Sequence, residues 1–151
     1  MNNIFRYIGY AAVSILIGWI SSLYPSIDYI GKIETSIVPI LLSLLVLYTT
    51  LSSLLVKEIL KYKSSHENNQ EINIAPTINS LKRNVIIELA ILCITFVSLS
   101  CKGILLNALS NYTWIVNTFT NSLTVFSVLY FILVIYDSFA GLFDILIENS
   151  K

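Results

Sequence analysis

The sequence predicts an all-α integral membrane protein, a bundle of four transmembrane helices in a single domain of residues 1–151. Hydrophobic residues make up 56% of the chain and charged residues only 12%, and the mean hydropathy is +0.78. These values are too apolar for a water-soluble domain of this length. Four long apolar stretches, separated by polar connections, account for them.

We expect the membrane spans at about residues 4–24, 36–56, 85–101 and 120–147. A hydrocarbon core about 30 Å thick needs roughly 20 helical residues at about 1.5 Å each, and the first two stretches meet this length. The third span contains Glu88 near its start and is followed by Lys102. We expect both charges to lie near the membrane surfaces, with Lys102 extending toward water.

The region before the fourth span is uncharged but rich in Ser, Thr and Asn, which makes residues 103–122 too polar for lipid. We therefore expect an outer loop or a short interfacial helix there, with Tyr112 and Trp114 at the headgroups. The largest hydrophilic connection is 57–83. Its first part, 57–63, is expected to continue the second helix, and Pro76 marks a boundary before the third.

Basic residues predict the orientation of the chain. With both termini in the cytoplasm, seven basic residues lie inside and only Lys32 and Lys102 lie outside, as the positive-inside rule requires. The inside group is Arg6, Lys57, Lys61, Lys63, Lys82, Arg83 and Lys151. The sequence thus predicts a multi-pass protein of a bacterial inner membrane, with its N- and C-termini inside.

Motifs for cofactor or metal chemistry do not occur in this sequence. There is no CxxC pair, no metal-ligand spacing and no glycine-rich phosphate loop, and the single His66 lies in a hydrophilic connection. Cys93 and Cys101 lie eight residues apart on one predicted helix, where they cannot bond to each other, so we interpret them as packing residues. We expect neither a cofactor nor an enzyme.

Two features concern helix packing. Ser14, Gly18 and Ser22 repeat every four residues, a small-xxx-small pattern that permits close helix approach, either within the chain or between subunits. Glu88 is an ionisable residue inside a membrane helix, which makes it a functional candidate. Because Lys82 and Arg83 precede it closely, we expect a structural ion pair at the membrane boundary.

The fourth span carries the most suggestive pattern. Polar side chains at three- and four-residue spacing lead toward Tyr130, and carboxylates recur farther along the same helix. If several copies surround an axis, these residues would line a cation path with an acidic mouth and an apolar constriction; alternatively, they are the cytosolic edge of an amphipathic helix. The path residues are Thr120, Thr124, Ser127, Tyr130, Phe131, Val134, Asp137, Asp144 and Glu148.

The chain resembles the small four-helix membrane proteins of prophage exclusion and other bacterial anti-phage systems, the RexB type. Shared features are length, topology, the basic connection after the second span, Glu88 beside Cys93 in the third, and a polar end to the fourth. The resemblance covers the whole chain at the level of topology and composition. It implies an ion channel that depolarises the cell when an infection sensor releases it, and it assigns no residue roles.

The first functional hypothesis is a homo-oligomeric, cation-permeable effector in the lipid bilayer, gated by a cytoplasmic protein or an anionic nucleotide. The basic residues Lys57, Lys61, Lys63, Lys82 and Arg83 would make this contact, although anionic lipid headgroups explain them equally well. The formal net charge is zero, so we expect no stable nucleic-acid binding. The alternative is a non-conducting scaffold subunit of a larger membrane complex, and a holin is a third possibility.

Overall fold

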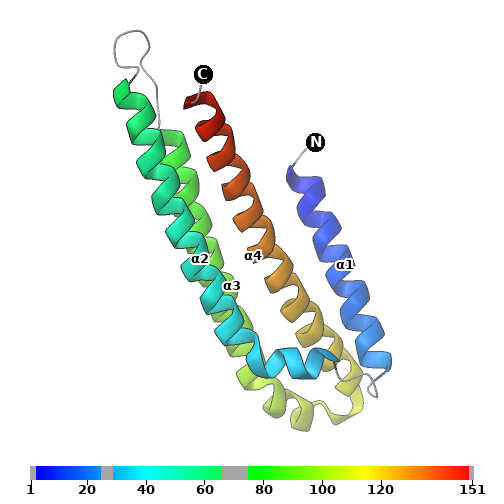
Figure 1. Ribbon diagram of the computed structural model, residues 1–151. Helices are drawn as coiled ribbons and strands as arrows, with labels where there is room; N and C mark the ends of the chain where they lie inside the picture. The colour runs from blue at the N-terminus through cyan, green and yellow to red at the C-terminus, as the bar shows by residue number, and fades with distance from the viewer. Residues whose placement is uncertain (1–2, 25–28, 66–74, 150–151) are drawn as a thin grey trace. The chain divides into compact units, whose positions relative to one another are not determined.

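The computed structural model describes residues 3–24, 29–65 and 75–149, and Figure 1 shows its helices. Helix α1 covers Asn3–Leu23, α2 Tyr29–Ser65, α3 Ala75–Ala108 and α4 Thr113–Asn149, and a short 3-10 helix, η1, covers Ser110–Tyr112. Each of the four α-helices is long and apolar enough to cross a membrane. The prediction of an all-α chain with four such helices is therefore confirmed.

Helices α2, α3 and α4 extend beyond the apolar stretches that predicted them. Helix α2 continues through Lys57 and Lys61, as expected, and it also contains Pro39. Helix α3 begins at Ala75, with Pro76 in its first turn, where the missing N–H of proline costs no helical hydrogen bond. Hydropathy marks only the part of a helix that suits lipid, whereas backbone hydrogen bonding continues into polar sequence.

The expected loop or interfacial helix over residues 103–122 is wrong in its extent. Helix α3 continues to Ala108, and α4 already begins at Thr113. The physical reason is that several polar side chains at the start of α4 are turned toward other helices instead of lipid: Asn121 is buried, and Thr118 is half-buried. Tyr112 and Trp114 are exposed, and their position at the headgroups stays a prediction.

The chain divides into two compact units. Unit 1 comprises Met1–Leu42 and Ala90–Tyr130, and unit 2 comprises Ser43–Leu89 and Phe131–Lys151. Among the described elements, α1 and η1 belong to unit 1 alone, whereas α2, α3 and α4 each contribute residues to both units.

In unit 1, α1 lies along the first half of α4 in the opposite direction. The Tyr7 and Tyr130 rings lie with their centroids 6.0 Å apart, and the Ser22 hydroxyl lies 2.7 Å from that of Thr118. An early residue of α1 thus pairs with a later residue of α4 and a late residue of α1 with an earlier one, so the two helices are antiparallel. Gly18 lies between these two contacts, against the backbone of Ser122, where no larger side chain would fit.

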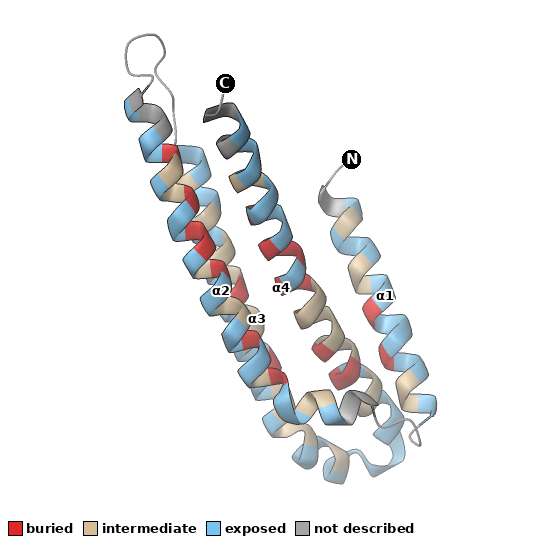
Figure 2. Cartoon of the chain, viewed as in Figure 1, coloured by how far each residue is buried: buried red, intermediate tan, exposed pale blue. Residues whose placement is uncertain are grey.

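The interiors of the two units differ in chemistry, and Figure 2 marks their buried residues in red. Among the described residues of unit 1, most buried side chains are small and polar: Ser14, Thr95, Thr120, Asn121, Thr124 and Ser127, beside Ile37, Leu41, Val116 and Tyr130. In unit 2 most are apolar: Tyr48, Leu51, Leu55, Ile59, Phe131, Leu133, Val134 and Ile135, beside Ser52, Glu88 and Ser138.

Many large apolar side chains are exposed on the outer faces of the helices. On α1 alone, Ile15, Leu16, Trp19 and Ile20 are each about half exposed or more. Such a surface suits lipid, while the backbone polar groups are satisfied inside the helices. The distribution is inverted relative to a water-soluble protein, because in unit 1 the polar groups lie inside and the apolar groups outside.

Candidate functional site

The candidate site is the polar interior of unit 1, and at its centre are three hydroxyl side chains on one face of α4. We call Thr120, Thr124 and Ser127 the hydroxyl stripe; each is at most 1% exposed. Their spacing of four and three residues places them on one face of the helix. The stripe predicted from the sequence thus exists, but it faces the chain's own helices in unit 1.

Two members of the stripe lie within hydrogen-bond distance of carbonyl oxygens in their own helix. Thr120 Oγ1 donates to the carbonyls of Val116 and Asn117, at 3.1 and 3.2 Å. Ser127 Oγ lies 2.7 Å from the Leu123 carbonyl oxygen. Serine and threonine in helices commonly bond to a carbonyl one turn earlier in this way.

Ser127 also contacts Thr95 of α3, whose hydroxyl lies 2.7 Å away. The Thr95 hydroxyl in turn lies 2.8 Å from the Ile91 carbonyl oxygen. Since each hydroxyl carries one proton, only one of the two can donate to the other while its partner donates to its own helix. The pair therefore has two equivalent proton arrangements and links α3 to α4 inside unit 1.

Some buried polar atoms of unit 1 have no hydrogen-bond partner among the described residues. They are Thr124 Oγ1, Ser98 Oγ and Glu34 Oε1. Buried polar groups normally form hydrogen bonds, and a buried group without one destabilises the fold by about 1–3 kcal/mol. A water molecule or a cation would satisfy these oxygens, since all three can act as acceptors.

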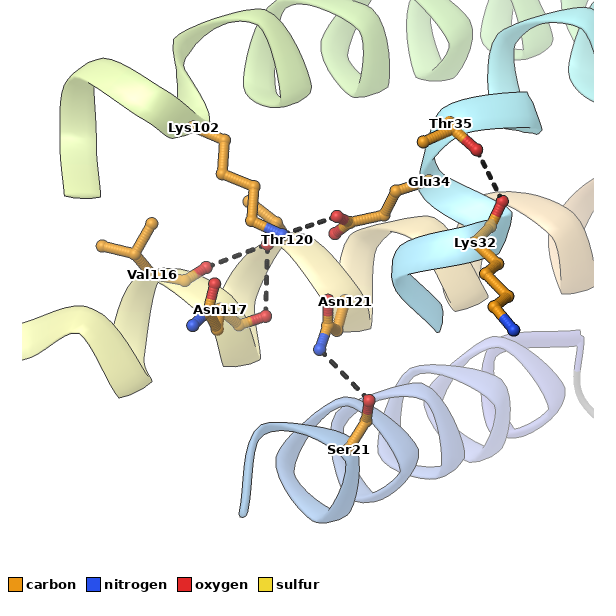
Figure 3. A network of polar contacts seen from close by, with 9 residues as sticks. All are labelled: Ser21, Lys32, Glu34, Thr35, Lys102, Val116, Asn117, Thr120 and Asn121. Atoms are coloured by element: carbon orange, nitrogen blue, oxygen red, sulfur yellow. Dashed lines mark hydrogen bonds and ion pairs between the residues drawn. The ribbon is translucent and has the colours of Figure 1, made fainter. Parts of the chain in front are cut away.

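An ion pair joins α2 to α3 in the same unit (Figure 3). Lys102 Nζ lies 2.5 Å from Glu34 Oε2, and the two side chains are 21% and 12% exposed. The expectation that Lys102 extends to water is therefore wrong. Its ammonium group instead pairs with the Glu34 carboxylate near the start of α2, which stabilises a charge on an apolar helix.

Helix α1 closes one side of the polar interior. The small-xxx-small residues Ser14, Gly18 and Ser22 face α4 within the chain: Ser14 and Gly18 are buried, and Ser22 meets Thr118. Next to them, Asn121 Nδ2 donates to Ser21 Oγ at 3.3 Å (Figure 3). Of the two packing interpretations, the structure places this pattern in an intra-chain contact.

The remaining predicted path residues lie in different surroundings. Tyr130 is buried in unit 1 against the rings of Tyr7 and Phe126. In unit 2, Phe131 and Val134 are buried, whereas Asp137 and Asp144 are exposed. The side chain of Glu148 lies outside the described residues. The hydroxyl residues therefore belong to unit 1 and the acidic residues to unit 2.

Glu88 lies in unit 2 and is fully buried. The predicted ion pair with Lys82 or Arg83 does not occur among the described residues, because both basic side chains are exposed while neither Glu88 oxygen has a hydrogen-bond partner. The prediction failed because Glu88 lies five and six residues beyond these cations, where a helix turns it to another face.

The predicted cytoplasmic contact residues are exposed where they are described. Lys57, Lys61, Lys82 and Arg83 all face outward, and the side chain of Lys63 lies outside the described residues. Arg83 also lines a shallow hollow of about 270 Å³ on α3, together with Pro76, Asn79 and Ser80. Among the described residues no three His, Cys, Asp or Glu side chains come together as they would around a metal ion.

Sequence reasoning missed Glu34, Thr95 and Asn121. The sequence did hold one signal for Glu34. Glu34 precedes one apolar stretch and Lys102 follows another, and two antiparallel neighbouring helices bring such positions together. No comparable signal pointed to Thr95 or Asn121, whose importance comes from burial alone. Comparison of the chain with protein-family models, with curated proteins and with solved structures found no match.

Proposed function

We propose that this chain is a membrane protein that conducts cations through unit 1, along the hydroxyl stripe of α4. The observation that supports this function most is the polar interior of unit 1, which lies behind an apolar outer surface. Polar groups inside a membrane-embedded protein are costly and mark ion or substrate paths. Hydroxyl and carboxylate oxygens can replace the hydration shell of a cation.

The path that we propose lies inside the chain instead of on an axis between copies. Thr120, Thr124 and Ser127 are at most 1% exposed within one chain, whereas a shared axis would need them on its surface. Thr124 is the central residue, because its hydroxyl has no hydrogen-bond partner among the described residues and is therefore available to a passing ion or water. An apolar constriction at Phe131 and Val134 stays a prediction.

The resemblance to phage-exclusion proteins would give such conduction a role: depolarisation of a bacterial inner membrane during infection. Exposed Lys57, Lys61, Lys82 and Arg83 would then receive the cytoplasmic protein or anionic ligand that holds the path shut. The exposed Asp137 and Asp144 of unit 2 would attract cations to the cytoplasmic side of the protein.

The test is potassium release from liposomes that contain the purified protein, compared with release driven by a chloride gradient. Thr124→Val keeps the side-chain shape and removes the unpartnered hydroxyl. We expect the fold to become more stable by about 1 kcal/mol, because an unsatisfied buried group is lost. We also expect potassium release to slow about tenfold, the effect of losing roughly 1.4 kcal/mol of ion stabilisation.

Thr50→Val is the matched control. Thr50 is exposed on α2 and its hydroxyl donates to the Val46 carbonyl at 2.8 Å, so potassium release should not change. Replacing Asp137, Asp144 and Glu148 together by their amides should reduce the preference for potassium over chloride. Equal release from wild type and Thr124→Val would contradict a path along the stripe.

A second function, a non-conducting scaffold, is favoured by a different observation. Several polar side chains of unit 1 are used in contacts between helices: Ser22 with Thr118, Ser21 with Asn121, and Thr95 with Ser127. In a scaffold these contacts only hold the helices together. Liposomes that stay tight in both gradients, with or without a bound cytoplasmic partner, would support it.

A further inference from the structure

Glu88 of α3 is the fully buried carboxyl group of unit 2. Its exposed fraction is 0%, and neither carboxylate oxygen has a hydrogen-bond partner among the described residues. The residue lies in the stretch of α3 that is apolar enough to cross a membrane. It is therefore a different feature from the Glu34–Lys102 pair, in which the carboxylate has a cation beside it.

The described residues of unit 2 provide no counter-charge for Glu88. The basic side chains described in unit 2 are all exposed: Lys57, Lys61, Lys82 and Arg83. Two buried polar side chains of unit 2 already donate to backbone carbonyls: Tyr48 Oη to the Leu81 carbonyl at 3.4 Å, and Ser138 Oγ to the Val134 carbonyl at 3.0 Å. The other buried side chains of this unit are apolar, apart from Ser52.

An ionised carboxylate without a partner is among the most expensive groups to bury. A positive charge supplied from outside the chain removes most of this cost. That charge is either a proton on a carboxyl oxygen or a small monovalent metal ion beside it. Glutamine would provide the same volume and packing without the cost, so packing alone does not explain a carboxyl group here.

We propose that Glu88 is a binding site for an exchangeable monovalent cation, a proton or a metal ion, within the membrane-spanning part of α3. The site resides in one side chain and requires no conduction through unit 1. Its failure and the failure of the channel proposal are therefore distinguishable, because binding at Glu88 is measured without any ion gradient.

The test uses dicyclohexylcarbodiimide, a hydrophobic reagent that reaches carboxyl groups from lipid, on the full chain in liposomes. A protonated carboxyl adds across one C=N bond: its oxygen bonds to the central carbon and its proton goes to nitrogen. The resulting O-acylisourea rearranges to a stable N-acylurea without losing an atom. Mass spectrometry of peptides then shows which carboxyl carries the added reagent.

We expect the label on Glu88 and not on Glu34, whose carboxylate is held by Lys102 in the same molecule. Glu88→Gln should remain folded and lose the label, whereas Glu88→Asp, which keeps a carboxyl group, should retain it. Sodium or potassium is then added at constant pH, with choline maintaining the ionic strength. Protection by the metal ion supports the site and assigns the metal as its occupant, and labelling without protection supports it and assigns the proton.

The proposal is overturned if Glu88 stays unlabelled in liposomes but is labelled once the chain is unfolded. That result would show a carboxyl that exchanges nothing with its surroundings. It is also overturned if Glu88→Gln retains the full label, because the reactive carboxyl would then be another residue. Chromatography of each variant in mild detergent confirms that it has the elution volume of the wild type.

Discussion

At the residue scale, Gly18 permits the close approach of α1 to α4 because it has no Cβ atom. A Cβ atom added at this position would lie 2.6 Å from the Ser122 backbone nitrogen and 2.8 Å from its Cα. Backbone atoms cannot rotate away as a flexible side chain can. Any larger residue at position 18 therefore pushes the two helices apart and weakens the contacts on either side, between Tyr7 and Tyr130 and between Ser22 and Thr118.

Gly18→Ala should accordingly destabilise the folded protein by about 1–3 kcal/mol, the usual cost of overpacking. The measurement is thermal unfolding in detergent, followed by far-ultraviolet circular dichroism. Gly9→Ala is the control on the same helix, because a Cβ at Gly9 would meet no atom within 4 Å. Equal losses in the two variants would show that the close contact at Gly18 does not contribute to stability.

Residue patterns predicted some of these positions and not others. The spacing of Thr120, Thr124 and Ser127 was sufficient to place them on one face, because helical periodicity is a local property. Which neighbour that face meets depends on the packing of helices distant in sequence, so burial inside the chain was not predictable. The partner of Glu88 was predicted wrongly for the same reason.

At the element scale, α2 and α3 are joined in unit 1 by an ion pair between Glu34 and Lys102. Both side chains are only partly exposed, so that either charge alone would be unfavourable there. Hydropathy predicted the centres of these helices correctly. It could not predict that α2 begins as early as Tyr29, because the turns around Lys32 and Glu34 are polar.

Replacing Lys102 by methionine should lower the unfolding free energy by about 1–2 kcal/mol, less than for a fully buried pair because both side chains retain some exposure. Exchanging the charges, with Glu34→Lys and Lys102→Glu together, should restore most of the loss. Lys32→Met is the control, since Lys32 is exposed two residues before Glu34. A charge exchange that is as unstable as Lys102→Met would contradict a stabilising pair.

At the scale of the whole molecule, composition was sufficient to predict four membrane-crossing helices, because the length of an apolar helix is set by the thickness of the bilayer. The division into two compact units was not predictable. The interiors of the two units also differ among the described residues, being mostly small and polar in unit 1 and mostly large and apolar in unit 2. A hydropathy average over each span conceals this difference.

The orientation is tested by labelling single cysteines in intact bacteria, after Cys93 and Cys101 are replaced by alanine. With both termini inside, Ser64→Cys should react with a membrane-impermeant maleimide only after the cells are opened, whereas Ser110→Cys should react in intact cells. Both positions are exposed, Ser64 in the last turn of α2 and Ser110 in η1 between α3 and α4. The opposite pattern would reverse the orientation.

The pairing of α1 with α4 also has a consequence for biosynthesis. Ser22 meets Thr118, and Ser21 meets Asn121, which lie 96 and 100 residues later in the chain. At about 5–20 residues per second, a ribosome needs roughly 5–20 seconds to reach these partners. During that interval α1 has left the ribosome before α4 is made, and its serine hydroxyls lack these partners in the insertion machinery or in lipid. Assembly of unit 1 is therefore completed only when translation of α4 is under way.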